Sequence, residues 1–461
     1  MGQPSHPELA IPPYSPQAKP AVGAREWYML FVLTACYTLA FTDSRLPLIL
    51  VESIKADLKL SDTQMGIIVG PAFSITYALA AVPIARLSDR YARKYVISVA
   101  IAVWSLFTTA AGASHNFMTL LLTRTGLAVG ESALTPAAHA MISDTFPGKS
   151  RGRAIAIYST GITLGSFLAL ALGGYINDRY GWRVAMYIVG ASGLFLAVLI
   201  LVTMKEPRRG ASADQRTDVG HKETVRSLFA DPVVRHTIIG GTLLCVAHGA
   251  TAWLPAYMLR NFSMTTSQVG AAFGVAAGGA GLIGVLAGGF INDWLAKRDM
   301  RWPFWFFAVA FVLGAVLKVV ALLMSSFIGF LFFICLSTLL LVSYPGPTYG
   351  MIQSRVDARS RSFASAVGLF CLQGIGISIG GLLTGWLSDT LTSFDGAAGS
   401  LRWALIIVSC FSALSGIHYY WATRHLRAAN GAILSPQREP GPDRPAINFD
   451  RDPSAGAGRP Q

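Results

Sequence analysis

The sequence predicts an all-α integral membrane protein with 12 transmembrane helices in two pseudo-symmetric six-helix bundles. Of its 461 residues, 53% are hydrophobic and only 13% are charged, which is roughly half of the ~25% charge of a typical soluble protein. Twelve apolar stretches reach the ~20 residues that a helix needs to cross a bilayer. Short motifs of the first half also recur in the second half.

The apolar stretches divide evenly on either side of a polar segment at 205–227. We therefore expect a six-helix bundle at 25–205, a cytoplasmic linker at 206–232 and a second bundle at 233–424. The proline-rich ends, 1–24 and 425–461, are expected to be disordered tails. The predicted spans are 27–50, 64–85, 95–113, 117–142, 153–176, 184–204, 236–258, 268–291, 303–324, 327–350, 363–387 and 401–422.

The basic residues predict the orientation, because Lys and Arg are retained on the cytoplasmic side of a membrane. With both termini placed inside, 28 of the 37 basic residues fall on the cytoplasmic side and six fall in outer loops. The sequence therefore predicts a multi-pass protein with both termini in the cytoplasm. The net charge of +13 has its origin in this topology, so no nucleic-acid partner is expected.

Three pairs of motifs indicate that the two halves are repeats. ARLSDRYARK at 85–94 corresponds to GFINDWLAKR at 289–298, and SRGRAIA at 150–156 corresponds to SRSFASA at 360–366. GYINDRY at 174–180 corresponds to GWLSDTL at 385–391, so all three offsets lie between 204 and 211 residues. Parallel repeats of this kind are typical of alternating-access transporters.

The motifs resemble those of the major facilitator superfamily. ARLSDRYARK is similar to its signature in the loop between helices two and three, with Ala85 and Ala92 where the family has glycine. RTGLAVGES at 124–132 is similar to its arginine-centred motif in helix four, and GWR at 181–183 and KEPRRG at 205–210 are also typical. The resemblance covers most of 25–424 and implies a transporter with the major facilitator fold, no enzyme activity and no cofactor.

Within the superfamily, the chain resembles bacterial spinster transporters most. The resemblance rests on an Asp late in helix one (FTDSRLPLIL), on GES in helix four and on EPRRG after helix six. Here Ser44 separates Asp43 from Arg45, whereas spinster proteins usually have Asp and Arg adjacent. The resemblance implies a location in the bacterial inner membrane and a lysophospholipid or sphingolipid substrate. Sugar-phosphate and organic-anion transporters share the helix-four pattern, so small organic anions or drugs stay an alternative.

Five ionisable residues lie well inside the predicted helices, where such residues mark transport pathways or proton relays. They are Asp43, Arg45, Arg124, Glu131 and Lys318. Asp43 and Arg124 each lie about eight residues from the outer end of their helix, hence at similar depth. Arg124 and Glu131 are two turns apart and share one helical face. Helices one and four line the central cavity in this superfamily, so we expect Asp43, Arg124 and Glu131 to face that cavity together.

These charges predict coupling to protons. A carboxylate balanced between desolvation and a nearby arginine can take up and release a proton, so Asp43 or Glu131 is the expected proton carrier. Arg124 would then modulate the carrier or bind substrate. The alternative is a static Asp43–Arg124 pair that only joins two helices. Arg45 points away from Asp43 and either contacts anionic substrate or head groups, or extends to the membrane surface, as we expect for Lys318.

The substrate prediction rests on polarity. The first half carries both charge signs, whereas the second half offers uncharged polar and aromatic groups such as His248, Tyr344, Tyr349 and Gln373. This asymmetry suits an amphipathic molecule. We expect His139 and His248 to be ordinary polar packing residues, and the protein to be a monomer whose partners are its substrate, protons and the lipid bilayer.

Prolines inside the predicted spans indicate bends, because proline cannot donate to the carbonyl four residues before it. Pro47 frees the carbonyl of Asp43, Pro136 frees that of Ser132, and Pro255 frees that of Thr251. Pro345 and Pro347 disturb helix ten in the same way.

The family resemblance also implies a cytoplasmic gate. Asp89 would cap the start of helix eleven near residues 360–362, with Arg90 beside it, and Arg93 would lie near Asp144. Asp293 would be the second-half counterpart and would face the start of helix five. Such contacts hold the cytoplasmic side closed in the outward-facing state and break in the inward-facing state.

Other classes of protein are less consistent with the sequence. The five cysteines form no CxxC pair, so neither a metal site nor a disulfide framework is expected. No nucleophile–base constellation indicates an enzyme. A receptor or a channel is the alternative from a different class, although a receptor has no need of five charged residues within its helices.

Overall fold

The computed structural model describes residues 23–146, 149–206, 221–356 and 360–433. Most of the two predicted tails and much of the linker lie outside these residues. The described part is almost entirely helical. Its helices are α1 (Ala24–Leu58), α2 (Asp62–Val69), α3 (Pro71–Arg90), α4 (Arg93–Gly112), α5 (Phe117–Glu131), α6 (Leu134–Thr145), α7 (Lys149–Tyr180), α8 (Trp182–Thr203), α9 (His221–Ala230), α10 (Pro232–Gly249), η2 (Ala250–Trp253), α11 (Leu254–Asn261), α12 (Thr266–Gly274), η3 (Val275–Ala280), α13 (Gly281–Ala296), α14 (Trp302–Leu323), α15 (Phe327–Leu341), α16 (Pro345–Ser354), α17 (Arg361–Leu369), η4 (Phe370–Ile377) and α18 (Ser378–Ile433).

These helices confirm the predicted fold of twelve spans. Several spans consist of two or three consecutive helices, such as α2–α3, α5–α6 and α10–η2–α11. Helix α18 supplies both the end of span eleven and all of span twelve, because its backbone turns at Asp395 and Gly396. Its last turns continue to Ile433, whereas the sequence predicts the tail to begin at 425.

Most of the predicted bends occur at the expected prolines. Span four breaks between α5 and α6 at Ser132 and Ala133, whose backbone precedes Pro136. Span seven passes through the 3₁₀ turn η2 just before Pro255, and span ten breaks just before Pro345. In contrast, α1 stays a continuous helix through Pro47.

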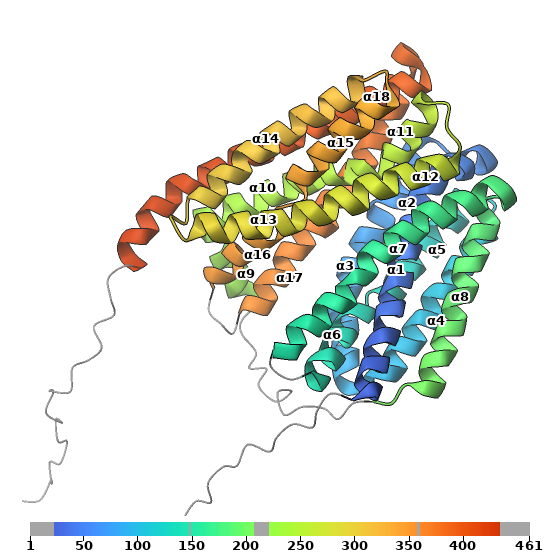
Figure 1. The fold of residues 1–461 in the computed structure, drawn as a ribbon, viewed down its shortest axis with the longest axis horizontal. Helices are drawn as coiled ribbons and strands as arrows, with labels where there is room; N and C mark the ends of the chain where they lie inside the picture. The colour runs from blue at the N-terminus through green and yellow to red at the C-terminus, as the bar shows by residue number, and fades with distance from the viewer. Residues whose placement is uncertain (1–22, 147–148, 207–220, 357–359, 434–461) are drawn as a thin grey trace, which may run out of the picture.

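The first bundle comprises α1–α8 and the second comprises α10–α18, with α9 between them in sequence (Figure 1). We call the face at which α1 begins and α18 ends the terminal face, and the face with the α1–α2 connection the opposite face. The bundles converge at the opposite face and diverge toward the terminal face (Figure 1). Gly270 of α12 makes one close approach possible, because a Cβ there would collide with the carbonyl oxygen of Leu170 in α7.

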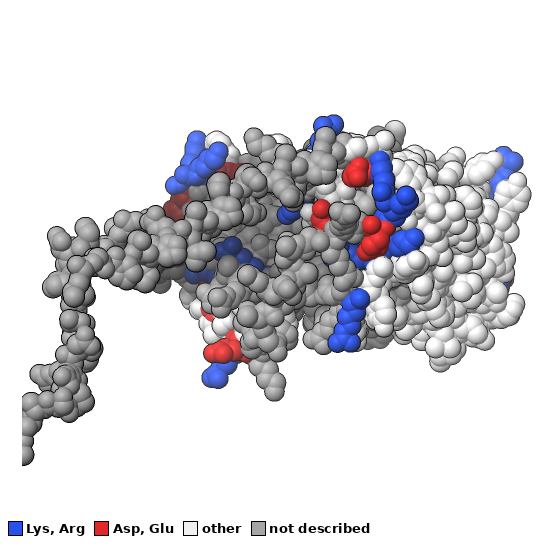
Figure 2. Space-filling view, turned by 90° about the horizontal axis from the view of Figure 1, so that it is seen from below, with Lys and Arg blue, Asp and Glu red and all other residues white. Residues whose placement is uncertain are grey.

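The outer surface is apolar, as a bilayer requires. Large side chains such as Phe195, Phe290 and Ile328 are 70%, 76% and 78% exposed, an arrangement that a soluble protein avoids. Figure 2 shows charged side chains gathered over part of the surface, whereas the broad area toward the right of that view carries few of them.

Candidate functional site

Ion pairs across the two bundles close the opposite face. Arg260 at the end of α11 donates to Asp62 at the start of α2, with nitrogen–oxygen distances of 2.7 and 2.8 Å. It also donates to Glu52 of α1 at 2.7 and 3.0 Å. Lys55 forms a further ion pair with Asp62, and Ser388 of α18 donates to it at 2.6 Å. Residues of both halves therefore meet on one carboxylate, which is only 3% exposed.

Two aspartates add a reciprocal pair of helix caps at the same face. Asp389 of the second half accepts the backbone N–H groups of Asp62 and Thr63 in α2, at 3.0 and 2.7 Å. Asp178 of the first half accepts those of Thr266 and Ser267 in α12, at 3.1 and 2.7 Å. A carboxylate at a helix N-terminus satisfies unpaired donors and complements the helix dipole. Each half thus caps a helix of the other.

These gate residues were not among the predicted site residues, although the sequence contained a signal for them. Asp178 and Asp389 occupy the same position in the repeated motifs GYINDRY and GWLSDTL. The helices that they cap both begin with a capping box, formed by Ser61 with Gln64 and by Thr265 with Gln268. The matching motifs therefore belong to one contact that the pseudo-twofold symmetry repeats.

Asp43, Arg124 and Glu131 come together inside the first bundle. They are 1%, 3% and 5% exposed, and each lies within electrostatic reach of the other two. Thr108 of α4 donates to Asp43 Oδ1 at 2.7 Å, and the guanidinium of Arg124 lies 5.3 Å from the centre of the Phe73 ring. Their burial differs from the expectation that they face an open cavity.

Among the residues that the structure describes, these three charged side chains form no ion pair with one another. One polar atom of each is buried without a hydrogen-bond partner, namely Asp43 Oδ2, Arg124 Nε and Glu131 Oε1. The static Asp43–Arg124 ion pair, the alternative expected from the sequence, is not formed in this conformation. Burying an unpaired charge is costly. Protonation of a carboxylate, or a rearrangement that pairs the charges, would lower the free energy of the cluster.

Arg45 projects into a different region from Asp43, as the two-residue spacing predicts. It lines a cavity of about 450 Å³ between the two bundles, together with residues of α7, α10, α13, α14 and α15. Lys318 and His248 line the same cavity. The expected substrate route between the halves is therefore bordered by Arg45 rather than by the buried Asp43–Arg124–Glu131 cluster.

The prediction that Lys318 extends to the membrane surface is wrong. Lys318 is 1% exposed, and its Nζ donates inward to the backbone carbonyl of Ala247 at 3.2 Å. The cavity wall contributed by the second half consequently carries a positive charge and is not limited to uncharged polar groups. Depth along a helix was readable from the sequence, whereas the side of α14 that faces inward was not.

At the terminal face, Arg93 forms an ion pair with Asp144 at 2.5 Å, so the structure brings these two predicted gate residues together within the first half. Glu206 of the KEPRRG motif accepts hydrogen bonds from the backbone N–H groups of Arg93 and Lys94 at 2.9 and 2.8 Å and so caps α4. This role was not predicted from the sequence. Arg90 is exposed. The side chain of Asp89 lies outside the described part of the chain.

Asp293, the predicted second-half gate residue, is exposed at the end of α13. The one hydrogen bond found for its carboxylate within the described ranges comes from the neighbouring Asn292, at 3.2 Å. The structure therefore does not bring Asp293 to the start of α7. The cross-half ion pair and helix caps lie at the opposite face, so the two halves are held together there in this structure.

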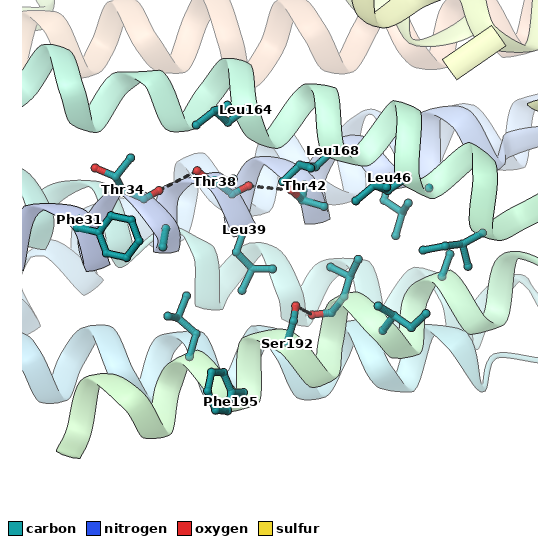
Figure 3. Close-up of a pocket in the computed structure, with 18 residues that line it drawn as sticks. Phe31, Thr34, Thr38, Leu39, Thr42, Leu46, Leu164, Leu168, Ser192 and Phe195 are labelled. Atoms are coloured by element: carbon teal, nitrogen blue, oxygen red, sulfur yellow. Dashed lines mark hydrogen bonds between the residues drawn. The ribbon is translucent and has the colours of Figure 1, made fainter. Parts of the chain in front are cut away.

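A second hollow of about 480 Å³ lies on the first half between α1, α7 and α8 (Figure 3). Its walls are mainly leucine, isoleucine and phenylalanine. The hydroxyls of Thr38 and Thr42 donate to carbonyls one turn earlier in α1, at 2.9 Å each, so they offer no donor to a ligand. Figure 3 thus shows an apolar groove that is chemically different from the basic cavity between the bundles.

Twelve spans in two repeated halves, with a cross-half gate at one face and a charged cavity between the halves, define a membrane transporter. The model of the Major Facilitator Superfamily matches residues 33–380. The chain belongs to the Major Facilitator Superfamily, which confirms the resemblance found in the sequence and the prediction that the protein is a transporter rather than an enzyme.

Two similar proteins are an efflux pump and a probable L-galactonate transporter. The chain is 34% identical over 408 residues to an MFS-type efflux pump of Mycolicibacterium smegmatis, covering 87% of this chain and 94% of that protein. It is 27% identical over 398 residues to a probable L-galactonate transporter of Escherichia coli, covering 81% and 83%.

The spinster resemblance has a structural counterpart. A crystal structure of a bacterial homolog to the human lysosomal transporter spinster, in an inward-facing and unoccupied conformation, superposes with a TM-score of 0.81. The two chains are 24% identical, and the match covers 88% of this chain and 99% of that one. At this identity the comparison shows the shared fold.

Proposed function

We propose that this protein is a proton-coupled secondary active transporter that works by alternating access. The observation that carries the proposal is the buried cluster of Asp43, Arg124 and Glu131, in which both carboxylates have an unpartnered oxygen. Protonation removes the cost of a buried unpaired carboxylate. Asp43 or Glu131 is therefore the proposed proton carrier, and Arg124 the cation whose position responds to its charge.

Alternating access is supported by the asymmetry between the two faces. Rocking the bundles would break the Asp178 and Asp389 caps and the Arg260–Asp62 ion pair, and would open the opposite face. The proposed gate of Asp89, Arg90, Arg93, Asp144 and Asp293 would then close the terminal face. We assign the terminal face to the cytoplasm of a bacterial inner membrane because 28 of 37 basic residues belong to that side.

The proposed substrate is an amphipathic lipid such as a lysophospholipid or a sphingolipid. The proposed transporting unit is a single copy of this chain. The spinster-like sequence motifs and the cavity wall, which joins charged and apolar side chains, support this class. A small organic anion is the second candidate, favoured by the basic residues of the cavity and by the relative from Escherichia coli, a probable L-galactonate transporter.

Uptake into proteoliposomes tests the proposal. Purified protein is reconstituted and supplied with lysophosphatidylcholine, lysophosphatidic acid, sphingosine, L-galactonate or a cationic drug, each with and without an imposed pH gradient. We expect accumulation of one amphipathic lipid only when the gradient is present. Movement of L-galactonate or the drug without any lipid movement would overturn the lipid assignment, and accumulation that ignores the gradient would overturn the proton assignment.

A further inference from the structure

The cavity between the bundles contains a cluster of basic side chains that come from three different helices. Arg45 belongs to α1 of the first half, whereas His248 of α10 and Lys318 of α14 belong to the second half. The charges of Arg45 and Lys318 both act on the His248 ring. The three groups therefore form one cluster across the interface that alternating access must rearrange.

Among the side chains that the structure describes, none that lines this cavity is acidic. Within the residues that the structure describes, neither Arg45 nor Lys318 forms an ion pair, and the hydrogen bond to Ala247 uses only one of the three N–H groups of Lys318. Among the same residues, no hydrogen bond to the His248 ring is found. Lys318 is buried and Arg45 is partly buried. Removing a cation from water without a counter-ion is costly, and an anion that enters the cavity would reduce that cost.

The rest of the wall is divided by polarity. Ser159, Thr163 and Ser166 of α7 line one side, and their spacing of four and three residues places them on one helical face. Phe273, Leu282 and Val285 provide an apolar side from the second half. A ligand with one anionic group and an apolar body would match both parts of the cavity.

The position of Arg45 follows from the sequence around it. Two residues correspond to about 200° around a helix, so Asp43 turns toward Thr108 while Arg45 turns toward the second half. Because Ser44 separates them, the proposed proton carrier and this basic side chain occupy different sides of α1. An anion at Arg45 would therefore lie on the other side of α1 from the Asp43 carboxylate.

We infer that Arg45, Lys318 and His248 form a binding site for the phosphate or carboxylate group of the transported molecule. Arg45 and Lys318 supply the charge-assisted hydrogen bonds, and His248 contributes a further polar contact between them. The apolar body of the ligand lies against Phe273, Leu282 and Val285. The inference rests on the proposed transport function, because it makes the cavity the substrate site.

Direct binding measurements on the full chain in lipid nanodiscs test the site without any proton gradient. Three radiolabelled probes are compared: oleoyl lysophosphatidic acid, the neutral monoolein with the same chain, and L-galactonate, which has the anionic group without the chain. We expect an anionic probe to bind at least about tenfold more tightly than monoolein, a difference of ~1.4 kcal/mol. Preference for lysophosphatidic acid identifies a lipid source for the anion, and preference for L-galactonate identifies a sugar acid.

Variants then assign that preference to the cluster. Arg45→Gln and Lys318→Met should each weaken binding of the anionic probe by about tenfold or more and leave monoolein binding unchanged. Arg45→Lys and Lys318→Arg, which keep the charge, should retain most of the affinity. Arg179→Gln is the matched control, because Arg179 is exposed and lies outside the cavity. Ligand-free unfolding temperatures identify any variant that fails to fold. If a charge-removing variant fails to fold, the test rests on Arg45→Lys and Lys318→Arg, and loss of anion affinity in both would contradict the site.

The site is wrong if the wild type binds monoolein as tightly as both anionic probes, or if the charge-removing variants bind the anion like the wild type. Failure of the transport proposal is distinguishable. Charge-dependent binding without gradient-driven transport would support the binding site and contradict proton-coupled transport. Gradient-driven transport, with anion binding unchanged in the variants, would support proton-coupled transport and contradict the binding site.

Discussion

At the scale of single residues, the proposed proton coupling depends on the carboxylates of Asp43 and Glu131. Asp43→Asn and Glu131→Gln keep the shape of each side chain and remove its capacity to exchange a proton. We expect each variant to lose transport driven by a pH gradient while it retains exchange of substrate across the membrane, measured by counterflow in proteoliposomes. Glu223→Gln, in the exposed part of α9, is the control and should behave like the wild type. Unchanged pH dependence in both variants would contradict the proton assignment.

Thr108 provides a second prediction at this scale. Its hydroxyl is the hydrogen-bond donor found for Asp43 within the described chain. Removing a partner from a buried acceptor costs about 1–3 kcal/mol, so Thr108→Val should lower the free energy of unfolding by that amount. Thr108→Ser keeps the donor and should cost much less. Equal losses for the two variants, measured by denaturant unfolding in detergent, would show that the hydroxyl contributes nothing.

The sequence indicated much of this residue-scale arrangement. Helix geometry gives the shared face of Arg124 and Glu131 and the similar depth of Asp43, and the family resemblance adds that helices one and four lie together. Lys318 shows the limit of such reasoning. The position of Lys318 along α14 follows from the sequence. Whether its side chain faces lipid or protein depends on how α14 packs against other helices, and the sequence of α14 alone does not show this.

At the scale of helices, the reciprocal caps at the opposite face hold the bundles together. Asp178→Asn and Asp389→Asn each remove one of the two acceptor oxygens and the negative charge at the helix N-terminus, which is worth about 0.3–1 kcal/mol. Each variant should therefore shift the population toward the state that is open at that face. Spin-label distances between Met118 of α5 and Phe394 of α18, both exposed, report this opening. We expect a longer-distance population to grow in each single variant and to grow further in the double variant.

Asp57 provides a matched control for these caps. It is an aspartate near the same face, but its ion pair with Arg183 joins two helices of the first half. Asp57→Asn should therefore leave the distance distribution unchanged. An equal response from Asp57→Asn would mean that general weakening of the face, rather than loss of cross-half caps, causes the opening.

The helices themselves were largely predictable, and the contacts between halves were not. Most of the predicted helix breaks lie just before a proline, because proline has no N–H to donate to the carbonyl four residues earlier. In contrast, Arg260 and Asp62 are 198 residues apart in sequence, and nothing near either residue specifies the partner. The repeated aspartates at 178 and 389 were visible as a motif, although only the packing of the two bundles shows that each caps a helix of the other half.

At the scale of the whole molecule, the two faces should move in opposite senses. The bundles meet at the opposite face through buried ion pairs and caps, and they diverge toward the terminal face (Figure 1). If the halves rock as rigid bodies, closure of the terminal face must accompany opening of the opposite face. Neutralising Asp43 in the Asp43→Asn variant imitates the protonated state and should favour one end of this equilibrium.

Distance measurements on two label pairs test this central claim most directly. Val202 and Met300 report the terminal face, and Met118 and Phe394 report the opposite face; all four residues are exposed. The pairs are introduced separately into a background in which the five free cysteines are replaced, and each is measured by double electron–electron resonance across a pH series with and without substrate. We expect conditions that shorten the Val202–Met300 distance to lengthen the Met118–Phe394 distance. Distances that stay fixed, or that change in the same direction at both faces, would contradict alternating access in this protein.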